Sequence, residues 1–181
     1  MANNNQTVPT TINDLKLTQL CESNLNDVME YLMKHFIPNE PTSRSVDLSC
    51  TDGWKITEAT IRNCLKFPYS YALRNEKDEI VATRMAMVIE RPKFNETSKC
   101  EGSINYEQEN EADGMAKSAI EITRLLNTLE SKIWHLVAPS TKKLLAIMII
   151  STHDKYTGRG LMRELLTFDL TEQKQAEKRK P

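Results

Sequence analysis

The sequence lacks the features of several large classes of protein. None of its apolar runs approaches the roughly 20 residues of a membrane-spanning helix. The polar segment 1–6 has neither the basic nor the apolar region of a secretory signal peptide. The 24 Lys and Arg residues nearly balance the 25 Asp and Glu residues, so no basic excess favours nucleic acid and no acidic excess favours disorder. We therefore expect a cytoplasmic protein that binds neither nucleic acid nor membranes.

The sequence also lacks the residue spacings of metal sites. Its four cysteines, Cys21, Cys50, Cys64 and Cys100, are scattered, and no paired His or Cys spacing typical of zinc occurs. In a chain without a secretion signal, such cysteines are typical of free thiols in a reducing compartment. The sequence therefore predicts free thiols and no metal site.

A length of 181 residues is enough for one domain with a substantial core. We expect a disordered N-terminus at 1–13, a single domain at 14–170 and a charged tail at 171–181. Hydrophobic periodicity predicts the element order β-α-α-β-β-α-β-α, an α/β chain, with a polar, irregular insertion at 91–111. The expected strands lie at 14–18, 69–73, 80–89 and 144–150, and the expected helices at 24–36, 51–65, 114–136 and 161–166.

The most informative segment joins an apolar run to a glycine turn near the C-terminus. The run Leu144–Ile150 is short and β-branched, which predicts a strand buried on both faces. Gly158 and Gly160 then precede a helical pattern, so the first helix amides are left uncovered at the positive end of its dipole. Such a turn suits a phosphate or pyrophosphate. It matches neither the dinucleotide fingerprint, which needs a third glycine, nor the P-loop, which needs Gly-Lys-Ser/Thr.

The sequence of this turn, Tyr156-Thr157-Gly158-Arg159-Gly160-Leu161, resembles the acetyl-CoA signature of the GNAT acetyltransferases. Thr157 stands where that family usually has Arg or Gln. The resemblance implies a GNAT-like acyl-CoA N-acyltransferase fold with a mixed sheet, and acetyl-CoA as co-substrate. It implies that the turn amides hold the pyrophosphate, that Arg159 contacts phosphates, and that the pantetheine arm pairs with the end of the strand. The implied cofactor-binding residues are Ile150, Ser151, Thr152, Thr157, Gly158, Arg159, Gly160, Leu161 and Met162.

A second segment, His35-Phe36-Ile37-Pro38-Asn39-Glu40-Pro41, resembles the arylalkylamine acetyltransferase branch known from insects. The resemblance implies a small amine substrate and makes Glu40 the general base that takes the amine proton. Taken alone, a Glu before a Pro in a loop is typical of a surface charge. His35, His135 and His153 are alternative bases.

The resemblance covers residues 15–170, after which acetyltransferases of this kind continue with a strand, a helix and a hairpin. About a dozen residues, rich in charge, follow Leu170, too few for a strand and a helix. We therefore expect a truncated product whose strand Leu144–Ile150 exposes one edge, and self-association through that edge. The alternative function is a non-catalytic, degenerate acetyltransferase fold that binds a protein partner at the same edge.

Overall fold

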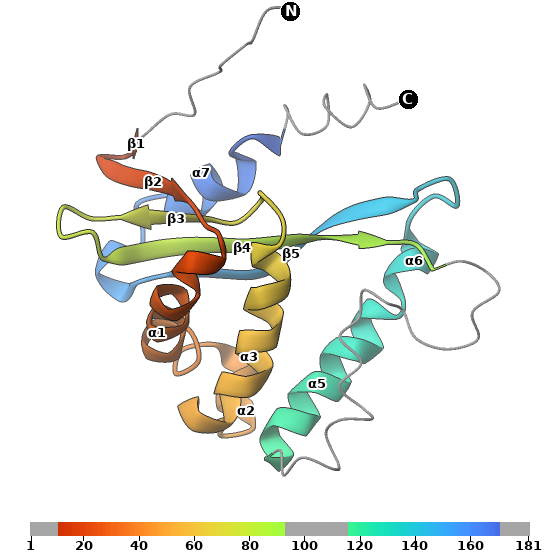
Figure 1. Ribbon diagram of the computed structural model, residues 1–181. Coiled ribbons are helices and arrows are strands. Elements are labelled where there is room, and N and C mark those ends of the chain that lie inside the picture. The colour runs from red at the N-terminus through yellow and green to blue at the C-terminus, as the bar shows by residue number, and fades with distance from the viewer. Residues whose placement is uncertain (1–10, 93–115, 171–181) are drawn as a thin grey trace, which may run out of the picture.

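The computed structural model describes residues 11–92 and 116–170, which form an antiparallel sheet with helices on both faces (Figure 1). The sheet has the order β1-β2-β3-β4-β5. Its strands are β1 (Thr11–Ile12), β2 (Leu15–Gln19), β3 (Tyr71–Arg74), β4 (Ile80–Glu90) and β5 (Lys143–Thr152). The helices are η1 (Glu22–Asn24), α1 (Leu25–His35), α2 (Pro41–Ser45), α3 (Cys50–Leu65), α5 (Lys117–Glu130), α6 (Ile133–Leu136), η2 (Asp154–Tyr156) and α7 (Leu161–Thr167).

The expected order β-α-α-β-β-α-β-α is confirmed, and the structure adds the short elements β1, α2 and α6. Two expectations differ from the structure, and a third is not tested by it. Every strand pair within the described residues is antiparallel, so the sheet is not mixed in strand direction there. Thr11 and Ile12 pair with β2, so strand structure is already present before the expected boundary at residue 14. Most of the expected insertion at 91–111, and the tail at 171–181, lie outside the described residues.

Local sequence explains why α1 and α3 form where they do. Val28, Met29 and Leu32 recur at helical spacing on one side of α1, and all three are fully buried. Ser49 caps α3, because its hydroxyl accepts a hydrogen bond from the amide of Asp52 at 3.0 Å. The second helix therefore begins slightly earlier than the sequence pattern predicts.

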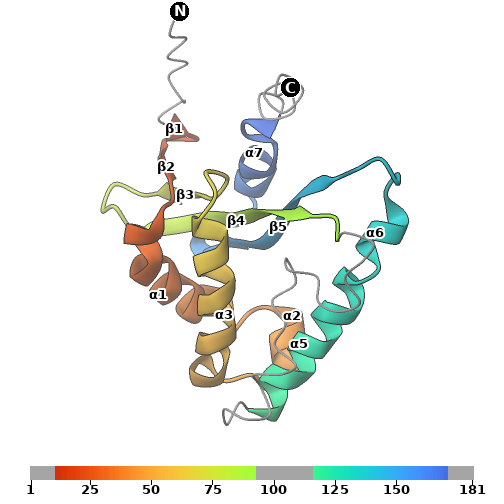
Figure 2. The same ribbon diagram turned by 45° about the vertical axis from the view of Figure 1, so that its right-hand side comes forward.

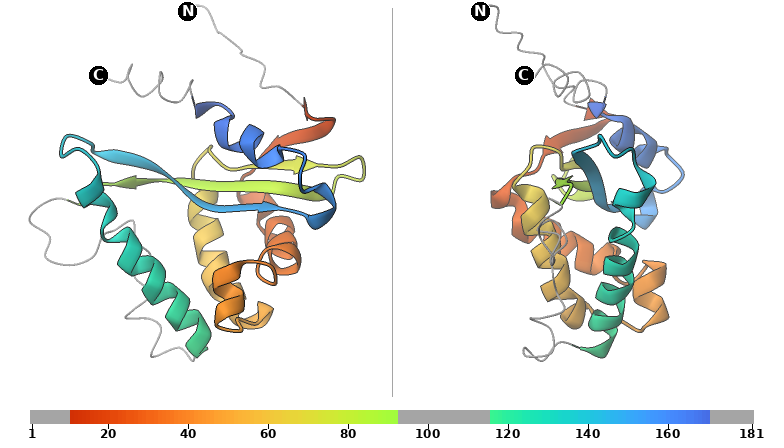
Figure 3. Two further views of the ribbon diagram at one scale, coloured as in Figure 1. Left: turned by 180° about the vertical axis from the view of Figure 1, so that it is seen from behind. Right: turned by 90° about the vertical axis from the view of Figure 1, so that its right-hand side faces the viewer.

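The sheet separates two hydrophobic clusters. The helices α1, α2, α3 and α5 lie on one face, and α7 lies on the other (Figures 1 and 3). The smaller cluster is formed by β2, β3 and β4 against Leu161 and Leu165 of α7, which are 1% and 0% exposed. A seven-residue helix is marginal by itself, so the burial of these two leucines, roughly 2 kcal/mol each, holds α7 on the sheet.

Strand β5 departs from the burial that its apolar sequence predicts. It pairs with β4 along its whole length, yet Ile147 and Ile150 are 41% and 42% exposed. The prediction that residues 144–150 are buried on both faces is therefore wrong. The reason is the position of β5 at the edge of the described sheet, where no described strand covers its outer side.

A β-bulge interrupts the pairing of β4 with β5. Met85 pairs with Ile149, but the next residue of β4, Ala86, pairs with Ile147. Met148 is therefore an extra residue on β5. A bulge of this kind bends the strand and breaks the regular ladder, and bulges are common beside functional sites.

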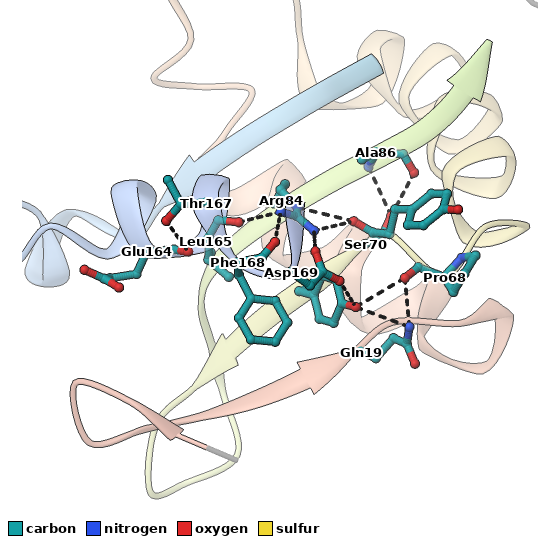
Figure 4. Close-up of polar contacts among 12 residues, drawn as sticks. Gln19, Pro68, Ser70, Arg84, Ala86, Glu164, Leu165, Thr167, Phe168 and Asp169 are labelled. Carbon is teal, nitrogen blue, oxygen red and sulfur yellow. Dashed lines mark hydrogen bonds and ion pairs between the residues drawn. The ribbon is translucent and has the colours of Figure 1, made fainter. Parts of the chain in front are cut away.

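A fully buried arginine fixes the C-terminal end of α7 to the sheet (Figure 4). The Arg84 guanidinium donates hydrogen bonds to the carbonyl oxygens of Leu165 (2.6 Å), Phe168 (3.2 Å) and Tyr69 (3.1 and 3.3 Å). It also lies 3.4 Å from Asp169 Oδ1. All five N–H donors of Arg84 thus have acceptors, and two of those acceptors are carbonyls at the end of α7, which the helix itself leaves unpaired.

Within residues 11–92 and 116–170, no helix is both long and apolar enough to cross a membrane. In the same ranges, no three His, Cys, Asp or Glu side chains are grouped so that they could hold a metal ion. Cys21, Cys50 and Cys64 are free thiols, and Cys100 lies outside the described residues.

Candidate functional site

Glu40 lies at the start of α2 rather than in an open loop. Its carboxylate accepts hydrogen bonds from the amides of Thr42 at 3.0 Å and Ser43 at 2.5 Å, and Pro41 occupies the first position of the helix. Proline suits that position because its missing N–H would have no helical partner. Glu40 therefore acts as the N-cap of α2, with its negative charge at the positive end of the helix.

The surroundings of Glu40 keep its carboxylate ionised. Partial burial raises the pKa, but the hydrogen bonds from Thr42 and Ser43 outweigh that effect, and the pKa lies below its ordinary value. At neutral pH the side chain is therefore a carboxylate with its orientation fixed by two amides, which is the protonation state that a base requires.

Glu40 lines a cavity of about 210 Å³ between the sheet and the helices α2, α3 and α5. Most of its wall is formed by Ile, Leu, Met and Phe side chains. Met148 and Ile149, at the bulge of β5, form part of the same wall. A small cavity with apolar walls and a few polar groups is the usual form of a small-molecule site. The interruption of the β4–β5 pairing at the bulge therefore lies at the wall of this cavity.

The other end of β5 leads to the glycine turn. Ile150, Ser151 and Thr152 pair with β4 on one side, opposite Arg84, Thr83 and Ala82 respectively, and no described strand pairs with their other side. The Ser151 side chain is buried, and its hydroxyl forms a hydrogen bond of 3.2 Å with the Tyr31 hydroxyl. Main-chain groups on the outer edge of β5, rather than the Ser151 hydroxyl, are therefore available to a ligand.

The turn before α7 has the geometry that its glycines predict. Gly158 and Gly160 both have a φ of +75°, a conformation that favours glycine. An added Cβ at either residue would meet no atom within 4 Å, so the requirement is conformational rather than one of space. No oxygen in the described ranges accepts a hydrogen bond from the amides of residues 158 to 162. These free amides and the missing Cβ atoms fit a pyrophosphate.

The side chains around the turn have separate roles. Leu161 and Met162 pack into the cluster beneath α7, so only their amides can face a ligand at the turn. The Thr157 hydroxyl donates to the Asp154 carbonyl at 2.8 Å. Arg159 is exposed, donates to the Asn13 carbonyl at 3.1 Å and lies over the Tyr156 ring at 5.4 Å. Arg159 is thus held against the β1–β2 turn.

The histidines lie outside the cavity of Glu40. The rings of His35 and His153 are in contact, with centroids 4.2 Å apart and planes tilted by 33°, and both residues line a second cavity of about 650 Å³ at the end of the sheet. Burial, followed by the neighbouring His153 and Lys34, lowers the pKa of His35. His135 is exposed on α6. None of the three lines the cavity that contains Glu40, which favours Glu40 among the candidate bases.

The structure therefore places the predicted residues along one path. Glu40 and the β5 bulge share a cavity, and residues 150–152 continue β5 from the bulge towards the turn. Thr152 lies three steps along the extended strand from Ile149, a distance of about 10 Å. The bulge at Met148 could not be predicted from the sequence, because every residue around it is apolar and the hydrophobic pattern does not define how β5 pairs with β4. Glu130 of α5 also lines the cavity. The sequence could have indicated this residue only through its position at the end of the amphipathic pattern of α5.

No protein-family model matches the sequence, and the search of curated proteins gives no significant match. Solved structures do match. Arylalkylamine N-acetyltransferase 2 from Aedes aegypti aligns with a TM-score of 0.66 at 21% identity, over 85% of this chain and 68% of that protein. The polyamine N-acetyltransferase of Drosophila melanogaster, which forms N-acetylagmatine, aligns with a TM-score of 0.65 at 16% identity, over 91% and 72%.

Mosquito arylalkylamine N-acetyltransferase like 5b gives a similar result, with a TM-score of 0.65 at 17% identity, over 90% of this chain and 72% of that protein. These identities are low, so the similarity concerns the arrangement of the backbone. The described chain therefore has the fold of these insect N-acetyltransferases.

Proposed function

We propose that this chain is an acetyl-CoA-dependent N-acetyltransferase of a small amine, with arylalkylamines as the substrate class that its sequence resemblance favours. The observation that carries the proposal is the position of Glu40, an oriented carboxylate in the wall of a small apolar cavity beside the bulge of β5. The GNAT fold supports the reaction class, and the free thiols fit the cytoplasm.

Two parts of the structure take part in the proposed reaction. At the turn, the amides of residues 158 to 162 bind the pyrophosphate of acetyl-CoA, and the outer edge of β5 positions its pantetheine arm. In the cavity, Glu40 accepts a proton from the amine, directly or through water, so that the nitrogen lone pair becomes available. Apolar walls keep bulk water from the reacting groups.

The transfer is balanced without a covalent intermediate on the protein. The amine nitrogen forms a bond to the acetyl carbonyl carbon, and the bond from that carbon to sulfur breaks. The nitrogen loses its second proton to solvent as the amide forms, and the sulfur leaves as a thiolate that takes up one proton from solvent. Glu40 releases the first amine proton to solvent, so the net reaction frees one proton. Glu40 thereby returns to its ionised form.

Replacing Glu40 tests the proposal. In an assay of thiol release with acetyl-CoA and 2-phenylethylamine, we expect Glu40→Gln to lower the rate by about 10²–10⁴-fold, the usual contribution of a general base. Acetyl-CoA affinity should stay nearly unchanged, because the carboxylate acts on the amine. Glu76→Gln, an exposed carboxylate outside this cavity, is the matched control. An unaltered pH-rate profile in Glu40→Gln would remove Glu40 from the mechanism.

A further inference from the structure

The cavity of Glu40 contains a second carboxylate. Among the side chains that line it, Glu40 and Glu130 carry negative charge and no Lys, Arg or His carries positive charge. Ile122, Leu126 and Glu130 are four residues apart in turn, so they share one face of α5. That face lies on the cavity, and the N-terminal part of α5 runs beside α2 while its C-terminal end approaches the sheet (Figure 2).

The position of Glu130 is unfavourable for a negative charge. Glu130 is the last residue of α5, where the helix dipole is negative, and the last turn contains no basic residue. The side chain is half-buried and has no hydrogen bond or ion pair with any residue of the described ranges. Burial also raises its pKa. A carboxylate placed in this way is stabilised by a cation.

The two carboxylates differ in their partners, and this difference assigns their roles. Two backbone amides already compensate the charge of Glu40, whereas nothing described compensates the charge of Glu130. The amine that is acetylated must be neutral when it attacks. A positive charge that remains for Glu130 must therefore belong to a second group of the substrate.

We infer that Glu130 is a specificity-determining residue that binds the second cationic group of a small diamine, an inference that rests on the proposed function. One end of the substrate is acetylated beside Glu40, and the other end is held by Glu130. The apolar wall between the carboxylates contacts the hydrocarbon body. A cavity of about 210 Å³ suits a short diamine rather than a long polyamine. The second cationic group distinguishes such a substrate from the arylalkylamines that the sequence resemblance favours.

The test compares 1,5-diaminopentane with pentylamine, which carries a methyl group in place of the second ammonium. We expect the parent protein to acetylate the diamine with a kcat/KM about tenfold higher or more. Glu130→Gln should remove this preference through a higher KM for the diamine, with pentylamine little changed. Glu121→Gln is the matched control, because Glu121 lies on α5 but does not line the cavity.

Equal kcat/KM for the two amines in the parent protein would overturn the inference, as would an equal loss for both in Glu130→Gln. Calorimetric titration with each amine, without acetyl-CoA, tests Glu130 independently of turnover. Tighter binding of the diamine that disappears in Glu130→Gln, combined with no acetylation of either amine, would sustain the role of Glu130 and refute the proposed function. Acetylation of both amines with no difference in binding would do the reverse.

Discussion

At the scale of single residues, two charged side chains lie in surroundings that their local sequence does not predict. Glu40 precedes Pro41 and reads as a loop residue, yet it caps a helix and lines a cavity. Arg84 is in an apolar strand and is fully buried with acceptors for all of its donors. In both cases the charge is stabilised by main-chain groups, which leave no trace in a hydrophobic pattern.

The cap formed by Glu40 gives a prediction for stability against pH. The folded pKa of Glu40 is lowered, so its contribution is complete above the unfolded value near 4.3 and is lost as pH falls through the folded pKa. At pH 7 we expect Glu40→Ala to reduce the free energy of unfolding by about 1 kcal/mol, the usual value of an N-cap. The difference from the parent should shrink below pH 4.

Urea unfolding at pH 7 and pH 3 measures this difference. Glu76→Ala removes an exposed carboxylate and should change stability little at either pH. A cost of Glu40→Ala that is the same at both pH values would show that the carboxylate does not cap α2.

At the scale of secondary-structure elements, most of the fold could be predicted from the sequence, because long elements carry a strong period. Helix α1 follows from the spacing of Val28, Met29 and Leu32, and β4 follows from its apolar run. Helix α2 could not be predicted, since Pro41 reads as a helix breaker although it is the first residue of a helix. The exposure of β5 depends on which strands lie beside it, and the local sequence pattern does not identify those neighbours.

The candidate site, like the fold, could be predicted from the sequence only in part. The turn at Gly158 and Gly160 was predictable, because positive φ and free amides follow directly from glycine chemistry. The bulge at Met148 was not, since a register shift changes pairing without changing composition. The role of Arg84 in holding α7 was also not predictable, because its hydrogen-bond acceptors lie about 15 and 81 to 85 residues away in the sequence.

The attachment of α7 depends on Tyr71 as well as on Arg84. The Tyr71 hydroxyl donates a hydrogen bond of 2.6 Å to Asp169 Oδ2, and the Arg84 guanidinium lies 5.0 Å from the Tyr71 ring centroid. We expect Arg84→Met to reduce the free energy of unfolding by about 3–5 kcal/mol, because Asp169 and the α7 carbonyls lose their partner. Tyr71→Phe should cost about 1.5–3 kcal/mol.

Chemical denaturation of the two variants provides the measurement. Tyr69→Phe is the matched control, since the Tyr69 side chain stacks on Phe67 and its hydroxyl has no hydrogen bond within the described residues. If Tyr71→Phe were as stable as Tyr69→Phe, the bond to Asp169 would make no net contribution.

The glycine turn gives a prediction about ligand binding. Gly160→Val places a β-branched side chain at a φ of +75°, which costs about 1–2 kcal/mol locally, and covers the amides that we assign to the pyrophosphate. We expect this variant to lose acetyl-CoA binding. Asn tolerates the left-handed conformation better, so Gly160→Asn separates conformational strain from the presence of a side chain. Unchanged acetyl-CoA affinity in Gly160→Val would show that the assigned site is wrong.

At the scale of the whole molecule, β5 gives the chain an apolar edge. Ile147 and Ile150 are exposed, and no described strand pairs with the outer side of β5. We expect such an edge to pair with a second copy of the chain. Sedimentation velocity should detect dimers or larger species in the parent and mainly monomers in Ile147→Lys. Leu136→Lys, at a leucine that is 83% exposed on α6, is the control. A parent protein that sediments as a stable monomer at high concentration would contradict this expectation.

The central claim is that the turn before α7 and the edge of β5 bind acetyl-CoA, and calorimetric titration of the parent protein with acetyl-CoA tests it most directly. We expect saturable binding at one site per chain, with a dissociation constant in the micromolar to millimolar range common among enzyme substrates. The absence of saturable heat at millimolar acetyl-CoA, from protein shown to be folded, would contradict the claim.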